Sequence, residues 1–131
     1  MKPYLFLMFC WCCMACNAGR KIVVENKTKS DVEIVWVIKE DSIHQSPLYI
    51  SNSDVVKLTI HENSPRKKMT FTVGSGSWTP AVLNSFADDL HSMQLKWNTG
   101  FIKLDSSVKI VDFLRIRRKG IDNSVIHIVM K

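Results

Sequence analysis

The sequence predicts a mainly-β fold of the α+β class, an antiparallel sheet or sandwich of about seven to eight short strands with one or two short helices. Three observations predict it. Short segments rich in Val, Ile and aromatic residues recur along the chain, turn-forming residues separate these segments, and only two stretches space their apolar residues as a helix does. A chain of 131 residues can bury one core of its own, so we expect a single domain.

The expected strands span residues 21–25, 31–39, 48–50, 55–60, 68–73, 93–97, 101–104 and 125–130. The second strand has the clearest pattern, because four large apolar residues alternate with other residues and so share one face. These four are Val32, Ile34, Trp36 and Ile38. Val35 and Val37 add apolar side chains to the opposite face. We therefore expect this strand in the centre of a sheet, partly covered on both faces.

A turn signal lies between the strands expected at 55–60 and 68–73. Here Pro65 fixes one backbone dihedral, and the side chains of Asn63 and Ser64 can bond to their own backbone. This combination predicts a β-hairpin that pairs the two strands.

The first helix is expected to begin at Pro80, with Thr79 as its N-cap, because a proline at the first helical position loses no hydrogen bond. Its apolar stripe contains Val82, Leu83, Phe86 and Leu90. The second stretch, 107–116, fits two patterns. Ile110, Val111 and Leu114 would share a helix face, whereas Ile110, Leu114 and Ile116 also fit the alternation of a strand. We favour a short helix whose C-terminus holds the basic residues before Gly120. A strand at 107–116 remains the alternative.

The first residues of the chain are typical of an export signal. Lys2 is followed by an apolar run over residues 4–15, which is too short to span a bilayer as a helix. All four cysteines of the chain lie at or before Cys16. We expect a signal peptide at residues 1–15, a short tether at 16–20 and a single mainly-β domain at 21–131. Without a later cysteine the domain has no disulfide, which is less common in extracellular eukaryotic domains of this size and favours a bacterial envelope.

In this layout the chain resembles small lipoproteins of Gram-negative bacteria. The resemblance rests on the apolar run, on Ala15 directly before Cys16, and on a short β domain after them. It implies a diacylglyceryl group on Cys16 and a membrane-anchored location in the cell envelope, at the outer membrane or the periplasmic face. Cys13 stands where the motif of this family usually has Leu. The alternative is cleavage after Ala18, which would release a soluble secreted protein.

Residues 74–77 are a candidate anion-binding loop, because they lie between an expected strand and the start of an expected helix, where backbone N–H groups can face an anion. The four residues are Gly74, Ser75, Gly76 and Ser77. No Lys followed by Ser or Thr completes a nucleotide-binding loop after the second glycine. The commoner interpretation is a flexible turn that lets Trp78 fold back onto the core.

Two basic groups are candidates for contact with lipid head groups or an anionic glycolipid. They consist of Arg66, Lys67 and Lys68, and of Arg115, Arg117, Arg118 and Lys119. Solvated charge at a turn and at a helix end is the alternative. We do not expect nucleic acid as a partner, since the aromatic residues fall on apolar faces, as core residues do. These are Trp36, Trp78, Trp97, Phe86 and Phe101.

Asp88, Asp89 and His91 form the nearest thing to an acid–base cluster, with Asp88 and His91 three residues apart on one helix face. A small hydrolase is the weakest alternative, because neither a nucleophile nor a metal-ligand pattern accompanies these residues. No cofactor and no metal site are expected. We therefore expect a non-enzymatic envelope lipoprotein with a binding or structural role and another envelope protein as a candidate partner, and a soluble secreted binder or inhibitor is the alternative.

Overall fold

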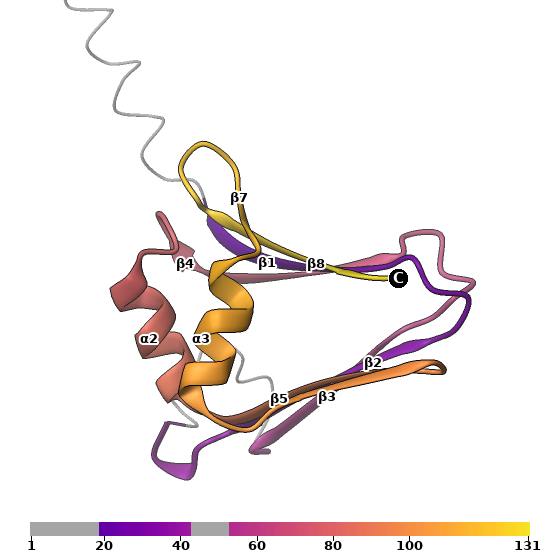
Figure 1. Cartoon of the computed structure of the whole chain (residues 1–131), viewed down its shortest axis with the longest axis horizontal. Helices are drawn as coiled ribbons and strands as arrows, with labels where there is room; N and C mark the ends of the chain where they lie inside the picture. Colours follow the sequence, from indigo (N-terminus) through magenta and orange to yellow (C-terminus); the bar gives the residue numbers. More distant parts are fainter. Residues whose placement is uncertain (1–18, 43–52) are drawn as a thin grey trace, which may run out of the picture.

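The computed structural model describes residues 19–42 and 53–131, where two four-stranded sheets pack face to face and two short helices fill one end (Figure 1). The first sheet contains, in spatial order, β4 (Lys68–Ser75), β1 (Gly19–Asn26), β8 (Val125–Met130) and β7 (Arg118–Lys119). The second contains β3 (Val55–Ile60), β2 (Val32–Ile38), β5 (Leu90–Trp97) and β6 (Gly100–Leu104). The helices are α2 (Pro80–Asp88) and α3 (Ser107–Arg115), and a single 3-10 turn, η2, covers Glu40–Ser42. Cys16 and the strand predicted at 48–50 lie outside the described residues.

The predicted mainly-β fold class is confirmed. All neighbouring strands pair antiparallel except β1 and β8, which run parallel. Figure 1 shows the sheets close together where β1 leads into β2 and further apart where α2 and α3 lie. The helices therefore complete a core that the two sheets alone would leave open at that end.

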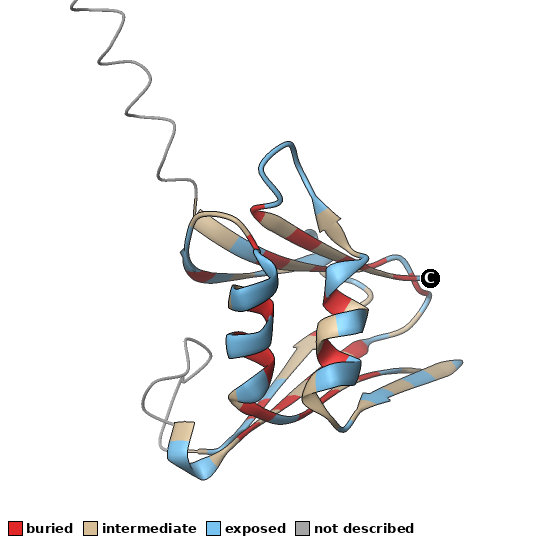
Figure 2. Ribbon diagram, turned by 60° about the vertical axis from the view of Figure 1, so that its left-hand side comes forward, coloured by how far each residue is buried: buried red, intermediate tan, exposed pale blue. Residues whose placement is uncertain are grey.

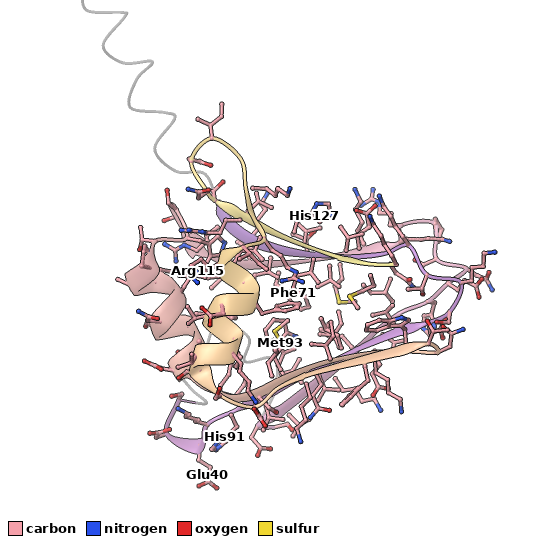
Figure 3. The ribbon with its side chains drawn as sticks, viewed as in Figure 1. Glu40, Phe71, His91, Met93, Arg115 and His127 are labelled. Carbon is pink, nitrogen blue, oxygen red and sulfur yellow. The ribbon has the colours of Figure 1, made fainter. Side chains whose placement is uncertain are left out.

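The core forms because apolar residues alternate along each central strand and face the opposite sheet. The predicted face of β2 is fully buried and the strand lies between β3 and β5, so its central position is confirmed. Trp36 contacts the edges of Phe71 and Phe86, with ring centroids 5.7 and 6.0 Å away. Phe71 and Met93 point from opposite sheets into the same space (Figure 3). Figure 2 shows the buried residues on the inner faces of the strands and on the helix faces turned toward them.

Helix α2 begins with the predicted cap, and α3 begins with a serine cap. The Thr79 hydroxyl accepts the Val82 N–H at 3.3 Å, and the Ser106 hydroxyl accepts the Lys109 N–H at 3.4 Å. Helix α2 buries Leu83, Phe86 and Ala87, and helix α3 buries Ile110 and Leu114. The helical interpretation of residues 107–116 is confirmed, since a helix places Ile110 and Leu114 on one buried face.

The hairpin predicted around Pro65 is wrong. Strand β3 pairs with β2 in one sheet, whereas β4 pairs with β1 in the other, so residues 61–67 carry the chain from sheet to sheet. Proline, Asn and Ser encode a reversal of direction, and this local signal does not specify which strand becomes the partner. The partner is decided by the inner faces, which must close on each other to exclude water.

Four smaller expectations also need correction. The helix ends at Arg115, and the last two residues of the basic run form strand β7 instead. His91 lies in β5, because α2 ends at Asp88 and the two residues cannot share a helix face. Phe101 is 56% exposed on the edge strand β6 and is not a core residue. Strand β1 begins at Gly19 and so includes the last two residues of the expected tether.

Candidate functional site

Residues 74–77 surround the guanidinium of Arg20, the second residue of β1. The guanidinium donates to the carbonyl oxygens of Ser75 at 2.6 Å, Ser77 at 3.1 Å and Val73 at 3.3 Å. Gly74 and Gly76 have φ of 70° and 92°, a left-handed conformation that glycine adopts without strain. These bends turn carbonyl oxygens toward Arg20, so the candidate anion loop surrounds a cation that belongs to the protein.

Trp78 leaves this loop and folds back into the core, as the sequence predicted. Its ring is fully buried and packs edge-on against Phe86 at 5.5 Å, while its indole N–H donates to the Lys21 carbonyl at 3.1 Å. The Arg20 guanidinium lies 5.4 Å from the ring centroid. Arg118 donates to the Trp78 carbonyl at 3.0 Å. Two arginines far apart in sequence thus hold one loop.

Arg117 is also engaged with the fold. Its guanidinium lies 3.7 Å from the centroid of the Phe113 ring and donates to the Phe113 carbonyl at 2.7 Å. Burial lowers the pKa of Arg117, because the charged form loses hydration. None of the ion pairs found within residues 19–42 and 53–131 includes Arg20, Arg117 or Arg118. These three positive charges are held by carbonyl oxygens and aromatic faces.

The end of the sandwich that contains Gly19, residues 74–77 and the loop 120–124 is here named the loop end. Besides the three arginines it carries the exposed cations Lys21 and Lys119, and two exposed apolar residues. These are Ile116, 73% exposed just after α3, and Ile121, fully exposed in the loop between β7 and β8. Arg115 lies at the same end and pairs with Asp112 at 3.0 Å (Figure 3). The loop end is therefore basic, with isolated apolar side chains at its surface.

The opposite end, which contains residues 27–31 and 61–67, is here named the turn end. Arg66, Lys67 and Lys68 lie there beside Glu25 and line a shallow depression of about 720 Å³. The Glu25 carboxylate contacts the Nε2 atom of His127 at 2.8 Å. The ammonium groups of Lys27 and Lys68 lie 3.9 and 4.0 Å from the same carboxylate. This group combines three cationic side chains with a carboxylate that offsets part of their charge.

The two basic groups, at residues 66–68 and 115–119, were both predicted to contact lipid head groups, and the structure places them at opposite ends of the sandwich. Lys68 pairs with Glu25 near the end of β1, and Ser75 pairs with Gly19 at its start. Glu25 is the sixth residue after Gly19 along β1, a distance of about 20 Å. A flat anionic surface that touches one end of the sandwich edge-on does not reach the other.

Asp88, Asp89 and His91 make no hydrogen bond or ion pair with one another among the described residues. Asp88 and His91 are exposed, and His91 belongs to the lower sheet of Figure 3. Asp89 lines a small depression of about 340 Å³ that Arg20 and Phe86 also line. The three side chains are therefore not brought together as an acid–base site.

A carboxylate–imidazole pair that sequence spacing did not reveal lies at the turn end. Asp31 and His61 are 30 residues apart and meet at 3.0 Å, because β2 and β3 are neighbours. The backbone N–H of Glu62, at 2.8 Å, and the His61 ring together lower the pKa of Asp31. Both side chains are more than half exposed, at 54% and 70%, which is typical of a surface ion pair. Only the strand pairing, which the sequence did not specify, identifies the partners.

The described residues contain no group of three or more His, Cys, Asp or Glu side chains placed to hold a metal ion. No helix in that part of the chain is long and apolar enough to cross a bilayer. No family model, curated protein or solved structure matches the chain. The fold and the surface define the class as a mainly-β, two-sheet domain with two short helices and a basic end.

Proposed function

We propose that the protein is an exported lipoprotein, in which a diacylglyceryl group on Cys16 tethers a non-enzymatic β domain to a membrane of the bacterial cell envelope. The observation that carries this proposal is the sequence around Cys16. An apolar run over 4–15 leads into Ala15 and a cysteine, and no cysteine follows in the remaining chain. The domain has a binding or structural role, with an envelope protein or an anionic glycolipid as partner.

The start of the first strand supports a close tether. Gly19 is already paired with Ser75, so the folded domain begins at the third residue after Cys16. A tether of this length holds the domain against the membrane surface, with little freedom to move away from it. Cleavage after Ala18, which would yield the soluble secreted binder or inhibitor, also leaves β1 whole.

The mature N-terminus separates these two alternatives. The full chain is expressed in a Gram-negative host, and the membrane and soluble fractions are analysed by intact mass and by mass spectrometry of the N-terminal peptide. We expect a membrane-associated protein whose first residue is a lipid-modified Cys16. The matched variant Cys16→Ser keeps the apolar run and removes the thiol, so it should remain as the unprocessed precursor. An unmodified N-terminus at Gly19 would overturn lipid anchoring and support the secreted form.

The role of the anchored domain is then addressed by cross-linking in intact cells followed by purification of the lipidated protein. A reproducible envelope protein or glycolipid adduct would support a binding role. Hydrolytic turnover that is lost in Asp88→Asn and His91→Gln would contradict the non-enzymatic proposal.

A further inference from the structure

We propose that the loop end is a membrane-docking surface, in which Lys21 and Lys119 face anionic lipid head groups and Ile121 enters the bilayer interface. This inference rests on the proposed lipid anchor at Cys16, and it adds an orientation of the domain and the residues that produce it.

The length of the tether selects the end of the sandwich that faces the bilayer. Three residues of fully extended chain span at most about 11 Å, so a lipidated Cys16 holds Gly19 within that distance of the lipid head groups. The loop 120–124 lies beside the start of β1, because Lys21 pairs with Val125 and its N–H donates to the Ser124 carbonyl at 2.9 Å (Figure 1). The turn end lies about 20 Å further along β1.

The loop between β7 and β8 is built to project Ile121. Gly120 and Asn123 have φ of 88° and 52°, and these two left-handed residues flank the exposed isoleucine. The Asn123 carbonyl accepts the Trp78 N–H at 2.8 Å, and the Asp122 carboxylate accepts the Ser124 N–H at 3.1 Å. A fully exposed isoleucine at the tip of a hydrogen-bonded loop gains nothing from water, whereas insertion at a bilayer interface buries its apolar surface.

The charge around this loop suits an anionic bilayer. The side chains of Lys21 and Lys119 are exposed and take part in no hydrogen bond or ion pair within the described part of the chain. The guanidinium groups of Arg20, Arg117 and Arg118 add positive charge, and none of them pairs with a carboxylate of the described segments. Asp122 is the acidic residue of the loop itself, and its carboxylate is bonded to Ser124. Each lysine near an anionic surface strengthens binding by about fivefold.

The turn end lacks this combination. Its basic residues, Arg66, Lys67 and Lys68, surround Glu25, and no large apolar side chain between residues 61 and 67 is exposed. Phe101, 56% exposed at the start of β6, lies near this end, because Asn98 in the preceding turn bonds Ser30, but it belongs to the other sheet and not to the segment that carries these cations. Since the tether also begins at the other end, the loop end is the one that docks.

The test places a nitroxide spin label at Ile121→Cys in the full lipidated chain, which is reconstituted in phosphatidylcholine vesicles with and without phosphatidylglycerol. The introduced thiol is the sole free one, because residues 17–131 contain no cysteine and the Cys16 thiol carries the lipid. The matched control is Asn63→Cys, an exposed position at the turn end. Collision of each label with dissolved oxygen and with a water-soluble nickel chelate is measured by EPR power saturation.

We expect the label at residue 121 to collide with oxygen and to be shielded from nickel on anionic vesicles, while the label at residue 63 stays accessible to nickel. The added changes Lys21→Gln and Lys119→Gln should lower the ratio of docked to undocked protein by about 25-fold, the product of two lysines. If the protein is lipidated and residue 121 stays accessible to nickel, docking is overturned and the anchor stands. If the mass of the purified protein shows no lipid on Cys16, the anchor and the docking surface are both overturned.

Discussion

At each end of β1 one polar side chain fastens a neighbouring segment by hydrogen bonds to backbone carbonyls. Arg20 does this at the loop end, where its guanidinium binds three carbonyl oxygens of residues 73–77. Asn26 does it at the turn end, where its amide donates to the Ser30 carbonyl at 2.8 Å and the Ile60 carbonyl at 3.2 Å. The Asn26 side-chain oxygen accepts the N–H and the hydroxyl of Thr28, at 2.9 and 2.7 Å.

The two side chains differ in charge, and this decides how far each is buried. Asn26 is fully buried, because a neutral amide with all its hydrogen bonds made loses little when water is removed. Arg20 stays partly exposed, because its charge would cost far more to desolvate and no carboxylate of residues 19–42 or 53–131 pairs with it. The turn end is thereby closed around a neutral network, whereas at the loop end a guanidinium fastens the loop and adds positive charge to the surface.

The largest effect is expected from Asn26→Ala. This change leaves the buried Ile60 carbonyl and the Thr28 N–H without their partner, and should lower the free energy of unfolding by about 3 kcal/mol. Urea denaturation followed by tryptophan fluorescence measures it. Asn84→Ala, an exposed position on α2, is the matched control and should change stability by less than about 0.5 kcal/mol. Equal effects of the two changes would mean that the Asn26 network does not close the turn end.

A smaller loss is expected from Arg20→Ala, about 2 kcal/mol, because water can replace part of the guanidinium at the more exposed carbonyls. Arg20→Lys should recover less than half of this loss, since an ammonium group cannot span three carbonyls in one plane as the guanidinium does. Arg66→Ala at the turn end is the control and should be nearly neutral. A comparable loss in Arg66→Ala would remove the distinction between structural and free arginines.

The sequence allowed the fold class, most of the strands and both helix starts to be predicted, because each depends on neighbours along the chain. Alternation identified the buried face of β2, and Thr79 with Pro80 identified the start of α2. The partner strands of β3 and of β4 could not be predicted, because β3 pairs with β2 and β4 with β1, and the choice of partner depends on residues far away along the chain.

The candidate site was predicted less well for the same reason. Arg20, which lies in the expected tether, was not recognised as the residue that fills the glycine loop, since 53 to 57 residues separate it from its carbonyl partners. The basic run at 115–119 was recognised as a group. Its division into an ion-paired Arg115, an arginine stacked on Phe113 and an exposed Lys119 follows from the turn between α3 and β7.

Each end of the sandwich has one carboxylate whose effect on stability at acidic pH can be compared with that of the other. Hydrogen bonds from Glu62 and His61 lower the pKa of Asp31 at the turn end, and hydrogen bonds from Ser124 lower the pKa of Asp122 at the loop end, both below the ordinary 3.8. Because the folded state holds these protons less tightly than the unfolded state, both groups contribute stability above the unfolded pKa, and it is lost as pH falls through the folded pKa.

Asp31→Asn and Asp122→Asn should therefore each flatten the loss of stability that the wild type shows below its unfolded carboxyl pKa. The free energy of unfolding is measured in urea from neutral pH into this acidic range. Asp31→Asn should have the larger effect, because the His61 side chain adds to its hydrogen bond a coulombic attraction that Asp122 lacks. Asp88→Asn is the control, and an equal flattening there would assign the acid response to net charge instead of to these loops.

The smallest effect on stability is expected at the most exposed apolar residue of the loop end. Ile121→Ser removes a side chain that the fold does not bury, so the free energy of unfolding should change by less than about 0.5 kcal/mol. Ile126→Val, five residues later and fully buried in β8, removes a single methylene and should cost about 1 kcal/mol. If Ile121→Ser were the more destabilising of the two, Ile121 would be packed against the protein and could not insert into a bilayer. With stability unchanged, loss of vesicle docking in Ile121→Ser would instead be attributable to the contact between the isoleucine and the lipid.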